Sequence, residues 1–114
     1  LRDYLDSRDV CRALLKIAQI DPESYARVSP DRILNIASGT GRTIRSVLEL
    51  ALAAVYPPEE AKKLETRITV APPRADDVPN IVGAIDRYRA LFGENPGWIS
   101  LEETIRDAIK SSRA

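Results

Sequence analysis

The sequence predicts a helix-rich protein of the mixed α/β class, built as one small lobe. Three observations lead to this prediction: stretches with the apolar periodicity of amphipathic helices, two short apolar runs typical of buried strands, and turn residues between them. The helical stretches outnumber the strand-like runs, and two short strands cannot close a sheet by themselves. We therefore expect about four helices and two or more short strands in a single domain over residues 1–114.

The first helix is expected over residues 7–19, where apolar side chains recur at i, i+3, i+4 and i+7. Asp6 is placed to cap this helix, and Asp9 in its first turn complements the helix dipole. Residues 20–31 contain two prolines and predict a loop, with a short helical turn around residues 23–27. The apolar stripe consists of Val10, Ala13, Leu14 and Ile17.

Two apolar runs bounded by turn or proline residues predict strands, at residues 33–37 and 67–70. Residues 38–41, Ser-Gly-Thr-Gly, predict a turn after the first run. Further helices are expected over residues 43–55, 85–92 and 100–110, with a helical turn at residues 59–65. Their capping residues are Thr43 for the first of these helices and Ser100, paired with Glu103 in a capping box, for the last.

The composition excludes several classes of function. Lys and Arg together number 17 and Asp and Glu together 17, so no net field attracts the chain to nucleic acid or to a membrane surface. No stretch approaches the roughly 20 apolar residues that a bilayer span needs. The chain has no histidine, which removes the commonest general base and any Cys/His metal cluster. The single Cys11 favours a reduced, cytoplasmic setting and is expected to be buried in the first helix.

Two arginines lie beside carboxylates in separate segments, residues 2–6 (RDYLD) and residues 74–79 (RADDVP). Guanidinium groups brought together by folding can bind a pyrophosphate through paired, charge-assisted hydrogen bonds. A neighbouring carboxylate can accept hydrogen bonds from ribose hydroxyls. Two prolines stiffen the backbone before Arg74, which lowers the entropy lost when its side chain binds a ligand. From the residues alone, ligand binding and a structural salt bridge both remain open for these arginines.

The glycine turn at residues 35–42 (NIASGTGR) joins a predicted strand to a helix, as a phosphate loop does. It lacks the lysine of a Walker motif and the three-glycine spacing of a dinucleotide site, so a plain turn is the preferred interpretation. No tyrosine of the chain is followed by a lysine four residues later. The chain therefore contains neither a nucleotide-binding fingerprint nor a Tyr-x-x-x-Lys catalytic pair.

Four segments in this order resemble the C-terminal part of the extended short-chain dehydrogenase/reductases, the NAD-dependent epimerase/dehydratase family. They are residues 2–10 (RDYLDSRDV), 34–39 (LNIASG), 74–79 (RADDVP) and 100–105 (SLEETI), and the resemblance extends over nearly the whole chain. Within that family the chain looks most like the GDP-mannose 4,6-dehydratase and GDP-6-deoxy-4-ketohexose reductase branch, with UDP-sugar 4-epimerases second.

The resemblance implies roles for individual residues. Arg2 and Arg74 would bind the diphosphate of a GDP- or UDP-hexose, Asp77 would hold its ribose, and Tyr4 would pack near the nucleotide end. Residues 1–114 would be the substrate-binding lobe of an oxidoreductase, lyase or isomerase, without catalytic, cofactor-binding or metal-binding residues of its own.

In that family the N-terminal Rossmann lobe binds NAD or NADP and supplies the catalytic tyrosine and lysine. That lobe has no counterpart in this sequence, and a natural start at Leu1, inside a motif, is not expected. We therefore expect a fragment of a larger enzyme, inactive alone and able to self-associate through the face that the other lobe would cover.

Two features depart from the family pattern. The Gly-Asp pair that often precedes the third helix is replaced by Gly83-Ala84, so that helix is expected to lose its cap, and residues 92–99 replace the usual Leu-Gly-Trp-x-Pro stretch. Two other functions stay open. One is a freestanding, non-catalytic binding module with the same fold, and the other is a small helical protein-interaction domain.

Overall fold

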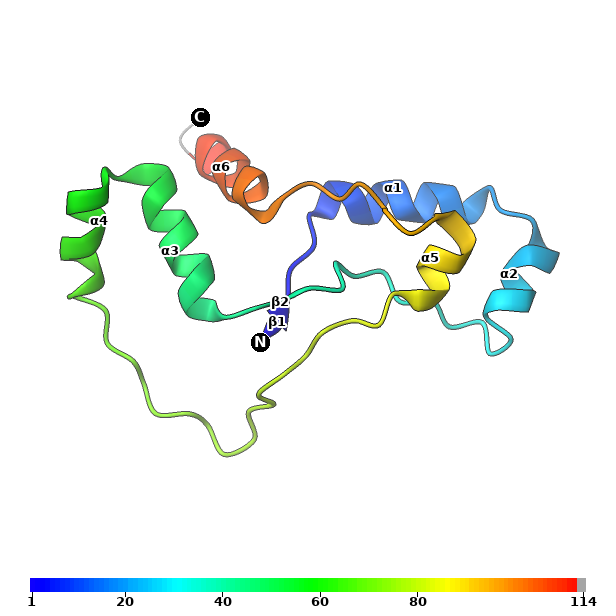
Figure 1. Cartoon of the computed structure of the whole chain (residues 1–114), viewed down its shortest axis with the longest axis horizontal. Coiled ribbons are helices and arrows are strands. Elements are labelled where there is room, and N and C mark those ends of the chain that lie inside the picture. Colours follow the sequence, from blue (N-terminus) through cyan, green and yellow to red (C-terminus); the bar gives the residue numbers. More distant parts are fainter. Residues whose placement is uncertain (113–114) are drawn as a thin grey trace.

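The computed structural model describes residues 1–112 and is helix-rich, with a small antiparallel sheet (Figure 1). This confirms the predicted mixed α/β class, with more helices than expected. The strands are β1, Arg2–Asp3, and β2, Gly41–Arg42. The helices are α1, Ser7–Ala18; α2, Pro22–Val28; α3, Ile44–Val55; α4, Pro58–Glu65; α5, Asp86–Phe92; and α6, Leu101–Ser112.

The predicted helices are confirmed to within a few residues, because their start signals act locally. The Asp6 carboxylate accepts a hydrogen bond from the backbone N–H of Arg8, and Thr43 Oγ1 accepts one from Ser46. Ser100 Oγ accepts from the N–H of Glu103 at 3.2 Å, which forms the predicted cap of α6. The helical turn expected at residues 23–27 is a complete helix, α2, because Asp21 caps it and Pro22 occupies its first turn.

The predicted strands are wrong. Residues 33–37 and 67–70 have no ladder partner among the described residues and lie in irregular backbone. The sheet instead forms from β1 and β2, which pairs Arg2 with Arg42 and Asp3 with Gly41. A parallel bridge joins Arg2 to Ile81 on the other side of β1. The run at 33–37 is apolar because three of its side chains, Leu34, Ile36 and Ala37, pack against the core.

The core is small and lies between α1, α5 and the segment before α6. Its buried apolar residues are Ala13, Ile85 and Tyr88. The Tyr88 ring lies 4.8 Å from that of Phe92 and 5.2 Å from that of Trp98, measured between centroids. These tilted aromatic pairs pack at the centre of the core, with aliphatic side chains of residues 34–37 against them.

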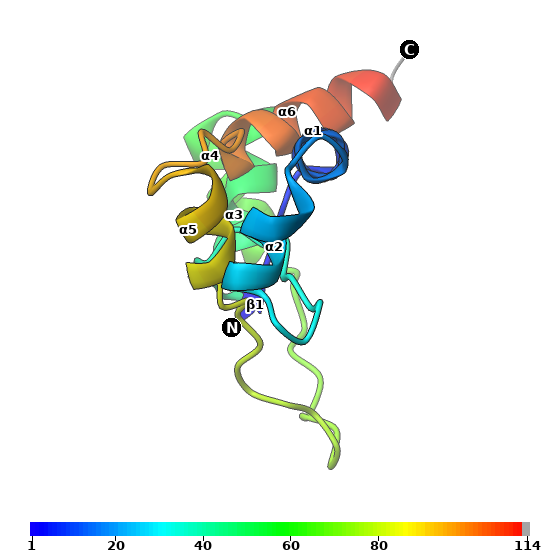
Figure 2. The ribbon, with the colours of Figure 1, turned by 90° about the vertical axis from the view of Figure 1, so that its right-hand side faces the viewer.

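Helix α1 buries a narrower face than its apolar stripe predicts. Asp9 and Ala13 are its buried residues, whereas Leu14 is 54% exposed. Cys11 is exposed, so its predicted burial is wrong. Only one side of α1 is covered by α5 and the residues before α6, and Figure 2 shows the other side open.

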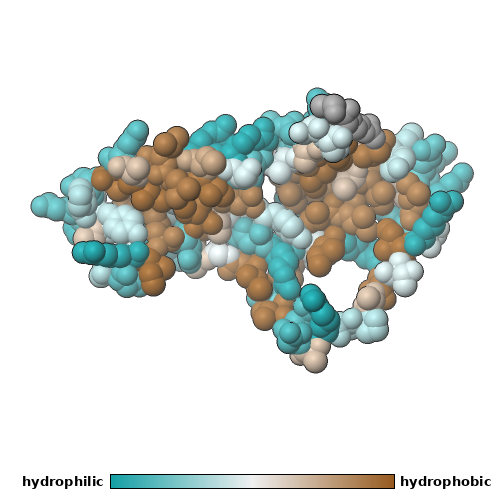
Figure 3. Space-filling model, turned by 180° about the vertical axis from the view of Figure 1, so that it is seen from behind, coloured by the Kyte–Doolittle hydropathy of each residue, from teal (hydrophilic) through white to brown (hydrophobic). Residues whose placement is uncertain are grey.

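The molecule is elongated and exposes an unusual amount of surface. Its accessible area is 8481 Å², whereas a compact monomer of 12.6 kDa exposes roughly 6,200 Å². Its radius of gyration is 17.8 Å, against roughly 13 Å for a compact domain of this length. Figure 3 shows broad apolar areas on one face. Among residues 1–112, the helices are all too short or too polar to cross a membrane.

An extended arm, residues 66–82, leaves the end of α4 and returns to the body beside β1 (Figures 1 and 2). Every residue of this arm is exposed. The arm contains Arg74 and Asp77, whereas β1 contains Arg2. The two predicted binding segments therefore belong to structurally different parts of the molecule.

Candidate anion-binding site

Arg2 is held in place where β1 meets the returning end of the arm. Its Nη1 donates hydrogen bonds to the carbonyl oxygens of Leu1 at 2.9 Å and of Val78 at 2.7 Å. The backbone N–H of Ile81 donates to the carbonyl of Leu1 at 2.9 Å, so a further hydrogen bond joins the end of the arm to the start of the chain. The Arg2 guanidinium group therefore contacts the RADDVP segment directly.

Arg74 lies in a tight turn of the arm. The N–H of Asp77 donates to the carbonyl of Arg74 at 3.1 Å, and the Arg74 N–H donates to Asp77 Oδ2 at 3.4 Å. The Arg74 Nη2 is 3.7 Å from Asp77 Oδ1, and the Arg74 side chain is 83% exposed. This is a weak surface ion pair, which leaves the guanidinium group accessible to a ligand.

The fold brings the two arginine segments into contact, although they are far apart in the sequence. Val78, which accepts a hydrogen bond from Arg2, comes four residues after Arg74. Four residues span at most about 14 Å, and the turn at residues 74–77 shortens this path. Arg2 therefore contacts the segment that contains Arg74, at the junction of the arm with β1.

Asp3 joins three segments of the chain through its carboxylate. It accepts hydrogen bonds from the backbone N–H groups of Ser38 at 2.8 Å, Gly39 at 3.0 Å and Gly83 at 3.0 Å. Burial raises the pKa of Asp3, but the hydrogen bonds from Ser38, Gly83 and Gly39 together lower it below its usual value. The absence of a side chain at Gly83 permits this contact, since a Cβ there would collide with Ala37.

The contact with Asp3 explains the glycine turn that resembles a phosphate loop. Its N–H groups at Ser38 and Gly39 already bind the chain's own carboxylate, and Gly39 has a φ of 76°. The turn is therefore a structural one, in agreement with the preferred interpretation. No local sequence signal predicts that Asp3 occupies this turn, because Asp3 and Ser38 lie 35 residues apart.

Asp6 shapes the start of α1, as expected, and also binds a distant helix. Its Oδ2 accepts a hydrogen bond from the Thr104 hydroxyl at 2.7 Å, and its Oδ1 accepts from the Arg8 N–H at 2.8 Å. Hydrogen bonds from Arg8 and then Thr104 hold the pKa of Asp6 far below its usual value. Arg8 also lies 3.0 Å from Asp107 of α6, so one small network joins α1 to α6.

Asp9 is buried beside the aromatic core. Its Oδ2 accepts from the backbone N–H of Ile99 at 2.8 Å, and its Oδ1 accepts from Arg12 at 3.0 Å. Asp3, Asp6 and Asp9 are spaced three residues apart, and each carboxylate binds a backbone or side-chain group that is distant in the sequence. These three aspartates are therefore structural.

Tyr4 is 37% exposed and borders a hollow of about 220 Å³ between α3 and α6. Asp6 and Thr104 contribute the polar part of this hollow. Its apolar lining comes from Leu5, Val47, Ile99, Leu101, Ile105 and Ala108. The structure thus places Tyr4 between β1 and this hollow, two residues from Arg2.

Two further arginines were not singled out from the sequence. Arg42 of β2 lies directly opposite Arg2 in the ladder. Arg87 of α5 binds the 29–33 loop, with Nη1 at 2.6 Å from Asp31 Oδ1 and 2.9 Å from the Ile33 carbonyl. The hydrogen bond from Arg87 lowers the pKa of Asp31 to about 2. Arg87 is therefore a structural residue, whereas Arg42 makes no ion pair among the described residues.

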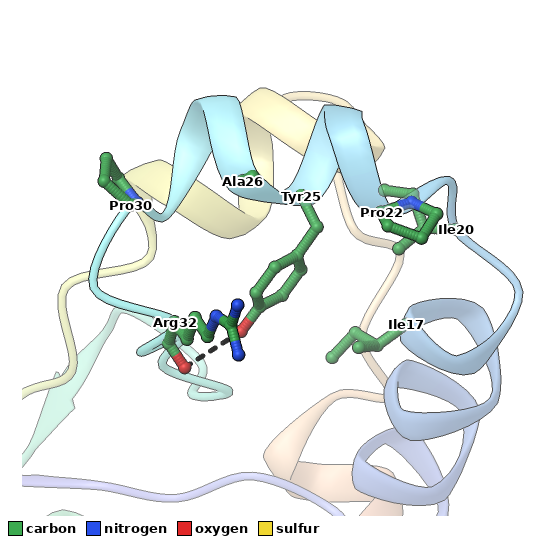
Figure 4. Close-up of a pocket in the computed structure, with 7 residues that line it drawn as sticks. All are labelled: Ile17, Ile20, Pro22, Tyr25, Ala26, Pro30 and Arg32. Atoms are coloured by element: carbon green, nitrogen blue, oxygen red, sulfur yellow. Dashed lines mark hydrogen bonds between the residues drawn. The ribbon is translucent and has the colours of Figure 1, made fainter.

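A larger hollow, of about 570 Å³, lies between α1 and α2 (Figure 4). It is lined by Ile17, Ile20, Pro22, Tyr25, Ala26, Pro30 and Arg32. The Tyr25 hydroxyl donates to the Arg32 carbonyl at 3.2 Å across it. The lining contains one cation and is otherwise apolar or aromatic, so it offers no clamp for a diphosphate.

No group of three or more metal-ligating side chains is arranged to bind a metal ion within residues 1–112. The loss of the cap before the third predicted helix is confirmed, because Ile85 at the start of α5 makes no side-chain capping hydrogen bond. No model of a protein family matches this chain, and no solved structure matches it significantly.

Proposed function

We propose that this chain is the substrate-binding lobe of an NAD(P)-dependent nucleotide-sugar dehydratase, epimerase or reductase. Arg2 and Arg74 would clamp the diphosphate of a GDP- or UDP-hexose. The observation that carries the proposal is the 2.7 Å hydrogen bond from Arg2 to the carbonyl of Val78, four residues after Arg74. This contact supports a site to which both arginines contribute.

The two arginines would make different contributions. Arg2 is already fixed by two carbonyl groups, so little side-chain freedom is lost when a phosphate binds its remaining N–H groups. Arg74 is exposed and only loosely paired with Asp77, so it can turn toward the ligand. Asp77 would then accept hydrogen bonds from the ribose, with Tyr4 near the nucleotide. Binding energy from this remote diphosphate would align the hexose for reaction.

The large accessible surface of the molecule supports the proposal that a second lobe packs against it. The accessible area exceeds that of a compact monomer of this mass by about a third. The exposed side chains include large apolar ones such as Leu15, Ile44 and Val70. Exposed apolar patches are typical of partner interfaces, and we propose that a Rossmann lobe covers this surface in the complete enzyme. Self-association of the isolated chain would use the same face.

The cofactor does not fit the residues of this chain. The glycine turn at residues 38–41, whose sequence is similar to a phosphate loop, is filled by Asp3 through the N–H groups of Ser38 and Gly39. We therefore assign NAD or NADP, and the proton and hydride transfers, to the proposed Rossmann lobe. The enzyme would work in the cytoplasm, where the exposed thiol of Cys11 stays reduced.

The test is calorimetric titration of the protein with GDP, UDP and GMP. We expect the diphosphates to bind and GMP to bind much more weakly, because it lacks the second phosphate. Arg74→Ala should weaken GDP binding by roughly 10- to 100-fold, the loss of a charged hydrogen-bonding group. The matched control is Arg106→Ala, which removes an exposed arginine from α6.

Equal affinity of the Arg74→Ala variant and the unaltered protein for GDP would overturn the clamp. The coding sequence upstream of Leu1 separates the proposal from a freestanding binding module. A glycine-rich βαβ stretch and a Tyr-x-x-x-Lys pair there would support the enzyme, whereas a start codon directly before Leu1 would support the module.

A further inference from the structure

Arg2 and Arg42 are directly opposed across the two-stranded ribbon of β1 and β2. Side chains of directly opposed residues in an antiparallel pair leave the same face, with Cβ atoms roughly 5 Å apart. Like charges in this position repel each other and destabilise the pairing. A sequence selected for stability alone would place an acidic or neutral residue at one of these positions.

The structure provides no counter-charge for this pair within the described residues. The ion pairs of residues 1–112 involve the guanidinium groups of Arg8, Arg12, Arg74 and Arg87. The nearest carboxylate in the ribbon, Asp3, binds three backbone N–H groups instead. Helix α3 begins two residues after Arg42 and has no acidic residue in its first turn.

We infer that Arg42 is a third cation of the diphosphate site and that the anion of a nucleoside diphosphate neutralises the Arg2–Arg42 pair. This inference rests on the proposed function and adds a residue to which the sequence analysis assigned no binding role. The contacts of Arg2 Nη1 with the Leu1 and Val78 carbonyls anchor one edge of its guanidinium group. A diphosphate on the same face of the ribbon would be bound by Arg2 and Arg42 from the sheet and by Arg74 from the arm.

A cation retained for a ligand should cost stability when the ligand is absent. The test therefore measures binding and stability in the same variants. The probes are inorganic pyrophosphate, which isolates the phosphate contacts, and GDP. Arg42→Thr is the main variant, because threonine keeps the strand propensity of β2 while removing the charge.

We expect Arg42→Thr to weaken pyrophosphate and GDP binding about tenfold or more. Without ligand, the same variant should unfold at a temperature roughly 1–5 °C higher, because the repulsion is relieved. Arg42→Lys keeps the charge but loses the paired N–H groups, so its affinity should lie between those of the other two proteins. Arg45→Ala is the matched control. It removes a nearby exposed arginine outside the ladder and should change affinity by less than about threefold.

The outcomes separate this inference from the proposed function. If Arg74→Ala weakens GDP binding and Arg42→Thr does not, the clamp stands and the role of Arg42 is overturned. If Arg42→Thr weakens binding and Arg74→Ala does not, the inference stands and the arm clamp falls. Failure of the unaltered protein to bind either probe overturns both proposals. Equal weakening of binding by Arg42→Thr and Arg45→Ala overturns the role of Arg42.

Discussion

Asp6 and Asp77 are the same residue type, and each lies near an arginine, but their surroundings are opposite. The Asp6 side chain is 4% exposed and binds Arg8 and Thr104. The Asp77 side chain is 41% exposed, and its arginine partner is 3.7 Å away. The first carboxylate is committed to the fold, whereas the second makes only a weak ion pair in an exposed turn.

The same contrast holds for the two parts of the molecule that contain them. The body around α1 is joined by side chains that bind residues 35 to 98 positions away, such as Asp3, Asp9 and Asp6. The arm, residues 66–82, contacts the body where it returns beside β1. Side-chain contacts between distant segments therefore hold the body together, whereas the charged pair of the arm, Arg74 and Asp77, is exposed.

The largest effect that should distinguish the two parts is acid unfolding. Hydrogen bonds hold the pKa of Asp6 below its usual value, and that of Asp31 at about 2. For Asp3, burial raises the pKa, but the hydrogen bonds together lower it by more, so the net shift of its pKa is also downward. Each group binds protons more readily in the unfolded chain, where the ordinary value is 3.8.

The stability that these groups contribute is fully present above about pH 4 and is lost as the pH falls toward about 2. Urea unfolding at pH 7, 4, 3 and 2 measures this loss directly. Asp31→Asn removes one of the three groups, so its free energy of unfolding should fall less steeply below pH 4. Parallel curves for the two proteins would contradict the role of Asp31.

The next effect compares the two aspartates directly. Asp6→Ala removes the cap of α1 and leaves the Thr104 hydroxyl and the Arg8 N–H without their acceptor. We expect the free energy of unfolding to fall by about 2–3 kcal/mol. Asp77→Ala changes an exposed turn and should alter it by less than about 0.5 kcal/mol. Similar losses in the two variants, measured by urea unfolding, would show that the arm is as integral to the fold as the body.

The helices could be predicted from the sequence because the signals that start them are local. Asp6, Thr43 and Ser100 each act on an N–H two or three residues away, and the apolar periodicity follows from helix geometry. The strands could not be predicted in the same way. A ladder needs a partner, and the partner of β1 is a glycine-arginine pair that has the composition of a turn.

Arg2 and Arg74 were chosen as site residues from their sequence segments, and their binding role stays a prediction. Arg42 carries no local signal, and only the structure shows that it lies opposite Arg2 in the ladder. The exposure of Cys11 was missed because an apolar periodicity does not say how much of a helix face its neighbours cover. Both the position of Arg42 and the exposure of Cys11 depend on contacts between residues that are distant in the sequence, which local patterns do not predict.

The smallest expected effect concerns a buried hydroxyl in the aromatic core, that of Tyr88. The Tyr88 side chain is fully buried in the aromatic core, and its hydroxyl has no hydrogen-bond partner among the described residues. Burial, with a contribution from the charge of Asp9, raises the pKa of this phenol. Tyr88→Phe should therefore leave stability unchanged or raise it by up to about 1 kcal/mol, because an unpaired buried hydroxyl costs free energy.

Tyr25→Phe is the matched change, since it removes a hydroxyl that does have an acceptor, the Arg32 carbonyl at 3.2 Å. We expect it to lower the free energy of unfolding by about 0.5–1 kcal/mol. Urea unfolding of the two variants side by side measures the difference. A clear loss of stability in Tyr88→Phe would mean that the hydroxyl has a hydrogen-bond partner in solution. The buried polar group in the aromatic core would then be paired, as the Asp6 carboxylate is.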